Sequence, residues 1–296
     1  MALTEAQAPA PVPTATRRKF RLPKLNARLY IGLTITAVIV LSALILPLFS
    51  SIDPAAQGTY FKNLPISAKH LLGTNALGQD IFWFLVFAIR NSLMLGVSVS
   101  LGCTVISALV GISAGYIGGW YERVAITLTD TFITIPVFPI LIVLSALVRG
   151  KTSFVTVAVI LICFGWAWNA RTVRSMALTL REREFINMAR FSGASTWHVI
   201  SKQIFPYVYS YLVVGFINTI LFAINTEAAL AVIGLSNVSV PTLGSIIFWA
   251  LNYNAMMIGQ VLWIVAPIVT TVTMFLGLFL TSTGFNEFFA ERRGVA

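Results

Sequence analysis

Long apolar runs, separated by short polar or charged segments, dominate this chain. Six of the runs come close to the roughly 20 residues that a helix needs to cross the hydrocarbon core of a bilayer. They cover Tyr30–Phe49, Leu93–Gly115, Val124–Val148, Thr152–Trp168, Tyr207–Ile233 and Ile258–Thr281. The pattern predicts an all-α integral membrane protein with six transmembrane helices.

The segments around the runs divide the chain into parts. Residues 1–28 are a tail, rich in Ala, Pro and Thr and predicted to be disordered up to residue 16, with a basic collar after it. Residues 29–89 hold the first span and a polar segment rich in turn formers, 90–283 a polytopic membrane domain, and 284–296 a C-terminal tail. The first run starts late and lacks a small-residue cleavage pattern, so we interpret it as a retained helix.

Basic residues set the expected orientation. With a cytoplasmic N-terminus, the outer segments hold only a quarter of the 20 Lys and Arg residues, namely Lys62, Lys69, Arg90, Arg149 and Lys151. The others flank the spans on the inner side. The positive-inside rule therefore predicts that both termini are cytoplasmic.

Composition supports a membrane protein and excludes several other classes. The chain has 296 residues, of which 57% are hydrophobic and 10% charged, and its mean hydropathy is +0.86. The net charge of +10 matches an anionic inner leaflet, so it requires no nucleic-acid partner. Cys103 and Cys163 fall inside spans as packing residues, while His70 and His198 lie on opposite sides, so we expect no metal site.

Two acidic residues, Asp130 and Glu227, lie within predicted spans. A buried charge is costly in a membrane, which makes each a candidate for the translocation path of a transporter. The alternative is a polar group that hydrogen-bonds between helices and holds their packing. We favour packing for both, because no basic residue is predicted inside the spans to complete a proton relay.

Other span residues indicate kinks and close helix contacts. Pro136 predicts a broken or kinked helix, and Gly111, Gly115 and Gly119 form small-xxx-small steps that allow another helix to approach closely. The outer segment 234–257 carries no charge yet is broken by Gly and Pro, which indicates a re-entrant or interfacial piece. Its Trp249 and Tyr253 are further candidates for the path or for packing.

A charged, helix-patterned segment, 180–206, stands between two apolar runs. It predicts one helix up to Phe191, a break at Ser192-Gly193, and a second short helix, Thr196–Gln203, that Ser195 caps and that ends at Phe205-Pro206. Such a knob suits a groove on a partner protein, although a solvated connector or a helix on the lipid surface fits the same pattern.

The segment "REREFINMARFSGASTWHVISKQIFP" resembles the Glu-Ala-Ala loop of the permease subunits of bacterial ABC importers, the second permease of the dipeptide/oligopeptide group in particular. "HLLGTNALGQDIF", "GYIGGWYER", "DTFITIP" and "TEAALAVIGL" resemble other parts of that group in the same order. Asn187 and Met188 stand where the signature has glutamate and alanine, and agreement fades after Leu235.

The resemblance implies the fold of a type I importer permease with a cytoplasmic coupling helix at Ser192–Gln203. It implies a bacterial cytoplasmic-membrane protein that works with a second permease, two ATP-binding subunits that hold ATP and magnesium, and an extracytoplasmic binding protein. The residues expected to couple to the ATPase are Glu184, Ala189, Arg190, Ser192, Gly193, Ala194, Ser195, Thr196, Trp197 and Pro206. Peptides are the expected substrates, with oligosaccharides or nickel as alternatives.

The chain itself is not expected to be an enzyme or to bind a cofactor. It has no H-E-x-x-H zinc motif, no G-x-S-x-G nucleophile elbow and no complete phosphate-binding loop. A proton-coupled secondary carrier using Asp130 and Glu227 is the rival from another class. Internal repeats, which many such carriers have, are not evident in the sequence.

Overall fold

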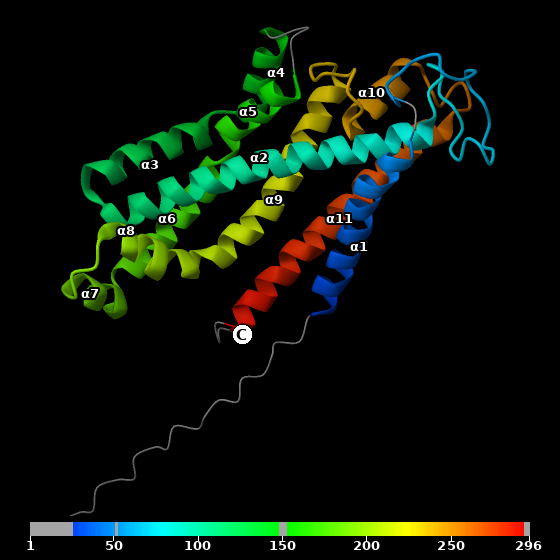
Figure 1. The fold of residues 1–296 in the computed structure, drawn as a ribbon. Helices are drawn as coiled ribbons and strands as arrows, with labels where there is room; N and C mark the ends of the chain where they lie inside the picture. The colour runs from blue at the N-terminus through cyan, green and yellow to red at the C-terminus, as the bar shows by residue number, and fades with distance from the viewer. Residues whose placement is uncertain (1–25, 51–52, 148–152, 293–296) are drawn as a thin grey trace, which may run out of the picture.

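The computed structural model describes residues 26–50, 53–147 and 153–292, so the predicted tail up to residue 25 and the loop with Arg149 and Lys151 lie outside the described residues. Within these ranges the regular structure is helical, apart from one isolated bridge between Thr74 and Asp80. In chain order the elements are α1 (Ala27–Ile45), η1 (Leu46–Phe49), α2 (Ile81–Ile117), α3 (Gly119–Thr134), α4 (Val137–Leu147), α5 (Phe154–Gly165), α6 (Ala167–Arg181), α7 (Glu184–Phe191), α8 (Thr196–His198), η2 (Val199–Ile204), α9 (Phe205–Val232), α10 (Leu243–Asn252) and α11 (Val261–Arg292). α1 runs beside α11, while α2 crosses α9 (Figure 1).

Five long apolar helical segments of the described chain, and one bent pair, account for the six predicted spans. Several boundaries differ from the sequence-based ones. The second segment begins at Ile81 rather than Leu93, and the fourth continues to Arg181 rather than ending at Trp168. Arg90 stands before the second apolar run and Arg171 after the fourth, yet both residues lie inside the continuous helix.

The third span is broken at Pro136, as the sequence predicts. α3 and α4 meet at 77°, and Ile135 between them is extended, with ψ 125°. Proline disfavours a helical conformation in the residue before it and cannot donate a backbone hydrogen bond, which explains the break.

The second short helix does not end at Phe205-Pro206, contrary to the prediction. The helix continues from Thr196 through η2 and α9 to Val232, a length of 37 residues. η2 is a π-helical stretch that ends at Ile204, directly before α9, and Pro206 is the second residue of α9. The wider π-helical turn accommodates a proline that would otherwise clash with the carbonyl four residues earlier.

Glycines let α2 lie directly against α6. A Cβ atom at Gly111 would come within 2.7 Å of the Ala170 carbonyl oxygen, and one at Gly115 within 2.6 Å of that of Arg174. Gly119, the third predicted contact glycine, instead has open space around it and a φ of +66°. It begins α3 after a tight turn, so the small-residue contact covers only two of the three predicted positions.

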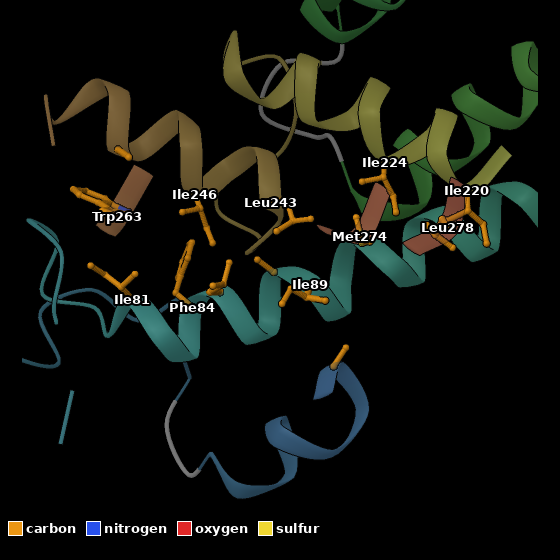
Figure 2. Packing of buried hydrophobic residues seen from close by; sticks show 14 of the residues in the cluster. Ile81, Phe84, Ile89, Ile220, Ile224, Leu243, Ile246, Trp263, Met274 and Leu278 are labelled. Atoms are coloured by element: carbon orange, nitrogen blue, oxygen red, sulfur yellow. The ribbon is translucent and has the colours of Figure 1, made fainter. Parts of the chain in front are cut away.

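The largest apolar cluster joins α2, α9, α10 and α11 (Figure 2). Ile81 and Phe84 of α2 lie opposite Ile246 of α10 and Trp263, while Ile224 of α9 packs near Met274 of α11. The short helix α10 is therefore buried among longer helices, in agreement with a segment too short to span. α1 runs along α11, and the Arg28 side chain forms an ion pair with Glu287 at 2.5 Å, so the start of α1 and the end of α11 lie together (Figure 1).

The segment between α1 and α2 is compact although it contains few regular elements. The Nδ1 atom of buried His70 lies 2.7 Å from the Oδ2 atom of Asp80. The other carboxylate oxygen of Asp80 accepts hydrogen bonds from the backbone N–H groups of Phe82 and Trp83 and so caps α2. This capping links the outer segment to the 37-residue helix α2.

Candidate functional site

The turn between α7 and α8 follows the predicted pattern closely. The Ala194 N–H donates to the Ala189 carbonyl, and the Gly193 N–H donates to the Arg190 carbonyl. This pair of bonds, with Gly193 at a φ of +80°, is a Schellman motif. The Ser195 hydroxyl accepts from the His198 N–H and caps α8, as predicted.

α7 is anchored to the helices beneath it by three contacts. Ile186 is fully buried, in a cluster with Ile112, Val173, Val199 and Ile204 among others. The Phe185 ring stacks on Tyr207 at a centroid distance of 5.3 Å. The Arg190 guanidinium lies over the Tyr116 ring, 5.4 Å from its centroid. These contacts fix α7 and the turn after it to α2, α6 and the start of the long helix that contains α9.

The opposite side of this turn is apolar and exposed. Met188, Phe191 and Trp197 are 69%, 92% and 68% exposed. We call residues 184–198 the α7–α8 knob. Exposed large apolar side chains of this kind occur where a protein meets a partner or a lipid surface.

The other residues predicted to couple to a partner lie on or beside this knob. Glu184 is exposed in the first turn of α7, where its charge favours the helix N-terminus. Ser192 and Thr196 are exposed, while Ala189 and Ala194 are partly buried where the knob packs against the cluster around Ile186. Pro206 is exposed but belongs to α9, not to the turn.

Glu227 lies near the other end of α9 and connects three segments. Its Oε1 atom accepts hydrogen bonds from the hydroxyls of Ser236, at 3.1 Å, and Thr242, at 3.0 Å. Thr242 in turn caps α10 in a reciprocal pair with Ser245. The Glu227 side chain is buried, so it holds the α9–α10 connection in place, which favours the packing interpretation.

Asp130 has a basic partner that the sequence analysis did not place in a span. The Arg171 Nη1 atom lies 3.5 Å from the Asp130 Oδ1 atom, and both side chains are about half exposed. Arg171 belongs to the fourth long helical segment, 154–181, which continues beyond the predicted end of the span at Trp168. The sequence contains a signal for this longer helix, because the apolar residues Ala170, Val173 and Ala177 continue at helical spacing past Arg171 and Arg174.

Trp249 and Tyr253 lie in an aromatic row with Phe248 and Trp263, with centroid distances of 5.2 to 6.1 Å between neighbours. The Trp249 indole N–H donates to the Val238 carbonyl. This arrangement favours packing for Trp249. In the described ranges the structure brings together no group of three or more metal-ligating side chains.

Comparison with known proteins identifies the family. Residues 107–294 match the family model described as "Binding-protein-dependent transport system inner membrane component". The chain belongs to this family. The match includes the α7–α8 knob, the Asp130–Arg171 pair and Glu227, so all three features are parts of the family's domain.

Two groups of relatives carry names of peptide transport systems. The oligopeptide transport system permease protein OppC of Mycobacterium tuberculosis is 35% identical over 170 residues, which cover 57% of this chain and 58% of that protein. The dipeptide transport system permease protein DppC of Bacillus subtilis is 28% identical over 84% of this chain and 81% of that protein. The alignment thus spans less than two thirds of the mycobacterial relative.

One solved structure supports the fold. A chain of the MetNI methionine ABC transporter, determined in inward-facing conformations, superposes with a TM-score of 0.51 at 21% sequence identity. The superposition covers 69% of this chain and 97% of the other. The predicted fold, that of an all-α ABC importer permease, is confirmed.

Proposed function

We propose that this chain is the permease subunit of an ATP-driven importer and forms half of its translocation path. The α7–α8 knob is the observation that carries the proposal. One side of the knob packs against the helices through buried Ile186, and the other side exposes Phe191 and further apolar side chains. An exposed apolar helix end of this kind suits a cleft on an ATP-binding subunit. Two such subunits, which hold ATP and magnesium, supply the hydrolysis, and the chain itself supplies none.

The continuous helix from Thr196 to Val232 gives the knob a mechanical role. When the ATP-binding subunits close, they move the knob, and the helix moves with it as a rigid element. Glu227 near the far end of this helix holds the cap of α10 through Thr242. In this proposal, motion at the ATPase side reaches the α9–α10 connection along one continuous helix.

The proposed substrates are peptides, in line with the names of the relatives from Mycobacterium tuberculosis and Bacillus subtilis. A second permease completes the path and an extracytoplasmic binding protein delivers the peptide. We place the protein in the bacterial cytoplasmic membrane with both termini inside, because the basic residues concentrate on that side.

Reconstitution tests this function. The tagged chain should co-purify with an ATP-binding subunit, and the complex with its binding protein should take up peptide only when ATP is supplied. Gly193→Pro should abolish uptake, because proline cannot take the left-handed conformation of Gly193 and its ring disturbs the turn. Gly193→Asn is the matched control, since asparagine tolerates that conformation. A homogeneous chain that transports without ATP would refute the proposal.

A further inference from the structure

The two carboxylate oxygens of Glu227 have very different surroundings. The whole residue is only 2% exposed. Its Oε1 atom accepts hydrogen bonds from the hydroxyls of Ser236 and Thr242. Its Oε2 atom is buried and has no hydrogen-bond partner among the described residues. A buried carboxylate oxygen without a partner is costly, so a bound group that compensates it is expected at this position.

The negative charge of Glu227 is also unbalanced within the part of the chain that the structure describes. None of the ion pairs found there includes Glu227. The side chains that surround the space beside it come from α2, α5 and the α9–α10 connection, and all of them are uncharged. An isolated buried charge is far more costly than an unpaired neutral group. A small positive species, either a proton or a cation, therefore has to balance it.

Glu227 lines a small cavity that limits the size of this species. The cavity has a volume of about 20 Å³, and roughly 10–15 Å³ is enough to hold a single water molecule. There is thus room for one guest of that size without a hydration shell. Mg²⁺ usually keeps several waters, and Ca²⁺ takes about 6–8 oxygen ligands, so neither fits. Much of the remaining wall is apolar and consists of Leu95, Phe154, Val157 and Val240.

The polar groups of the cavity supply oxygen atoms and a single negative charge. Besides the Glu227 carboxylate they are the hydroxyls of Ser236 and Thr242 and the side-chain amide of Asn237. Carboxylate, carbonyl and hydroxyl oxygens are the ligands that hard cations prefer. One carboxylate neutralises one monovalent ion, whereas a divalent ion would leave a net positive charge between apolar walls. The donor set therefore favours a monovalent cation.

We propose that Glu227, Ser236 and Thr242 form a binding site for one dehydrated monovalent cation of the size of Na⁺, held at the Oε2 atom of Glu227. The ion neutralises the carboxylate and leaves Oε1 to accept from the two hydroxyls. Because Thr242 caps α10, the bound ion strengthens the attachment of the α9–α10 connection to α9. This site is a property of the chain itself and does not depend on the proposed transport function.

Thermal unfolding of the purified full-length chain in lipid nanodiscs tests the site, with Na⁺ titrated against choline at constant ionic strength. Each tenfold increase in Na⁺ above its dissociation constant should raise the unfolding temperature by roughly 2–5 °C. K⁺, a larger ion, should have a smaller effect. Glu227→Gln should abolish the response, because an amide carries no charge. Glu287→Gln removes the more exposed carboxylate that pairs with Arg28, and as the matched control it should keep the full response.

Equilibrium dialysis with radioactive sodium measures binding directly. The wild type should bind one ion per chain and Glu227→Gln none. If Glu227→Gln does not fold, the wild-type comparison of Na⁺ with choline still decides. Equal unfolding temperatures in Na⁺ and choline refute the site, and a rise of the wild-type value at lower pH in choline would then assign a proton to Glu227. A full Na⁺ response in Glu227→Gln places the ion elsewhere and refutes the site as well.

A basic side chain from the loop before α5 is the remaining source of positive charge. Arg149 and Lys151 of this loop lie outside the described residues. The double variant Arg149→Gln with Lys151→Gln should keep both the stability in Na⁺ and the Na⁺ response of the wild type. If it instead loses as much stability as Glu227→Gln, and the wild type does not respond to Na⁺, a side chain balances Glu227 and the cation site is wrong.

Discussion

Phe191→Ala gives the most direct test of the α7–α8 knob. Phe191 is 92% exposed, so its side chain contributes little to the stability of the isolated chain. If a cleft of an ATP-binding subunit buries it, the lost transfer free energy is about 1.5–3 kcal/mol. A loss of that size weakens the binding of the ATP-binding subunit by about 10-fold to 150-fold.

The assay measures binding and stability in parallel. The chain is placed in lipid nanodiscs, and the dissociation constant of the purified ATP-binding subunit is determined by titration. The unfolding temperature of each variant is measured in the same preparation. Phe61→Ala is the matched control, because Phe61 is a phenylalanine of similar exposure, 85%, in the segment between α1 and α2.

Three results would refute the reasoning. The dissociation constant of Phe191→Ala could equal that of the wild type, which would exclude burial of the ring in the complex. Phe61→Ala could weaken binding equally, which would show a non-specific effect of removing exposed aromatic area. A large fall in the unfolding temperature of Phe191→Ala would show that the ring supports the chain itself.

Three further substitutions test the helix contacts by thermal unfolding of the purified protein. Glu227→Ala should destabilise it by about 1–3 kcal/mol, because the buried hydroxyl of Thr242 and the partly buried hydroxyl of Ser236 lose their acceptor, while Glu227→Gln keeps an acceptor oxygen and should cost less; equal costs would contradict this role. Gly115→Ala should cost about 1–3 kcal/mol by forcing α2 from α6, and more than Gly102→Ala, whose nearest neighbour is the flexible end of Ile162. Asp80→Ala should cost about 2–4 kcal/mol through the lost cap of α2 and the lost partner of His70, and Asp80→Asn, which can still cap, should be milder; a neutral Asp80→Ala would show that the outer segment does not depend on the pair.

Features encoded by neighbouring residues were predictable from the sequence. Apolar runs of sufficient length give the spans, Pro136 gives the break, and the Ser-Gly-Ala-Ser order gives a left-handed turn followed by a cap. Each depends on backbone preferences that act within one or two helical turns. The structure reproduces them at Ile135, Gly193 and Ser195.

Contacts between distant segments were not predictable in the same way. Asp130 and Arg171 are far apart in sequence, and their pairing depends on how α3 crosses α6. Gly119 matched the small-residue spacing of Gly111 and Gly115, yet the turn before α3 removes it from the helix contact. Spacing identifies residues that share a helix face, but it does not say where that helix ends or which neighbour it meets.

In the proposed function, the continuity of the helix through Pro206 links the α7–α8 knob to α9. A helix that ended there would leave the α7–α8 knob on a flexible connection, and motion imposed on the knob would dissipate before it reached α9. The π-helical stretch η2 instead carries the helix past the proline, while buried Val199 and Ile204 fix the stretch to the bundle. Near one end of this helix Ser195 caps α8, and near the other end Glu227 accepts a buried hydrogen bond from Thr242 of the α10 cap. Under the proposed function, a displacement of the knob that moves this helix as one body therefore also shifts the α9–α10 connection.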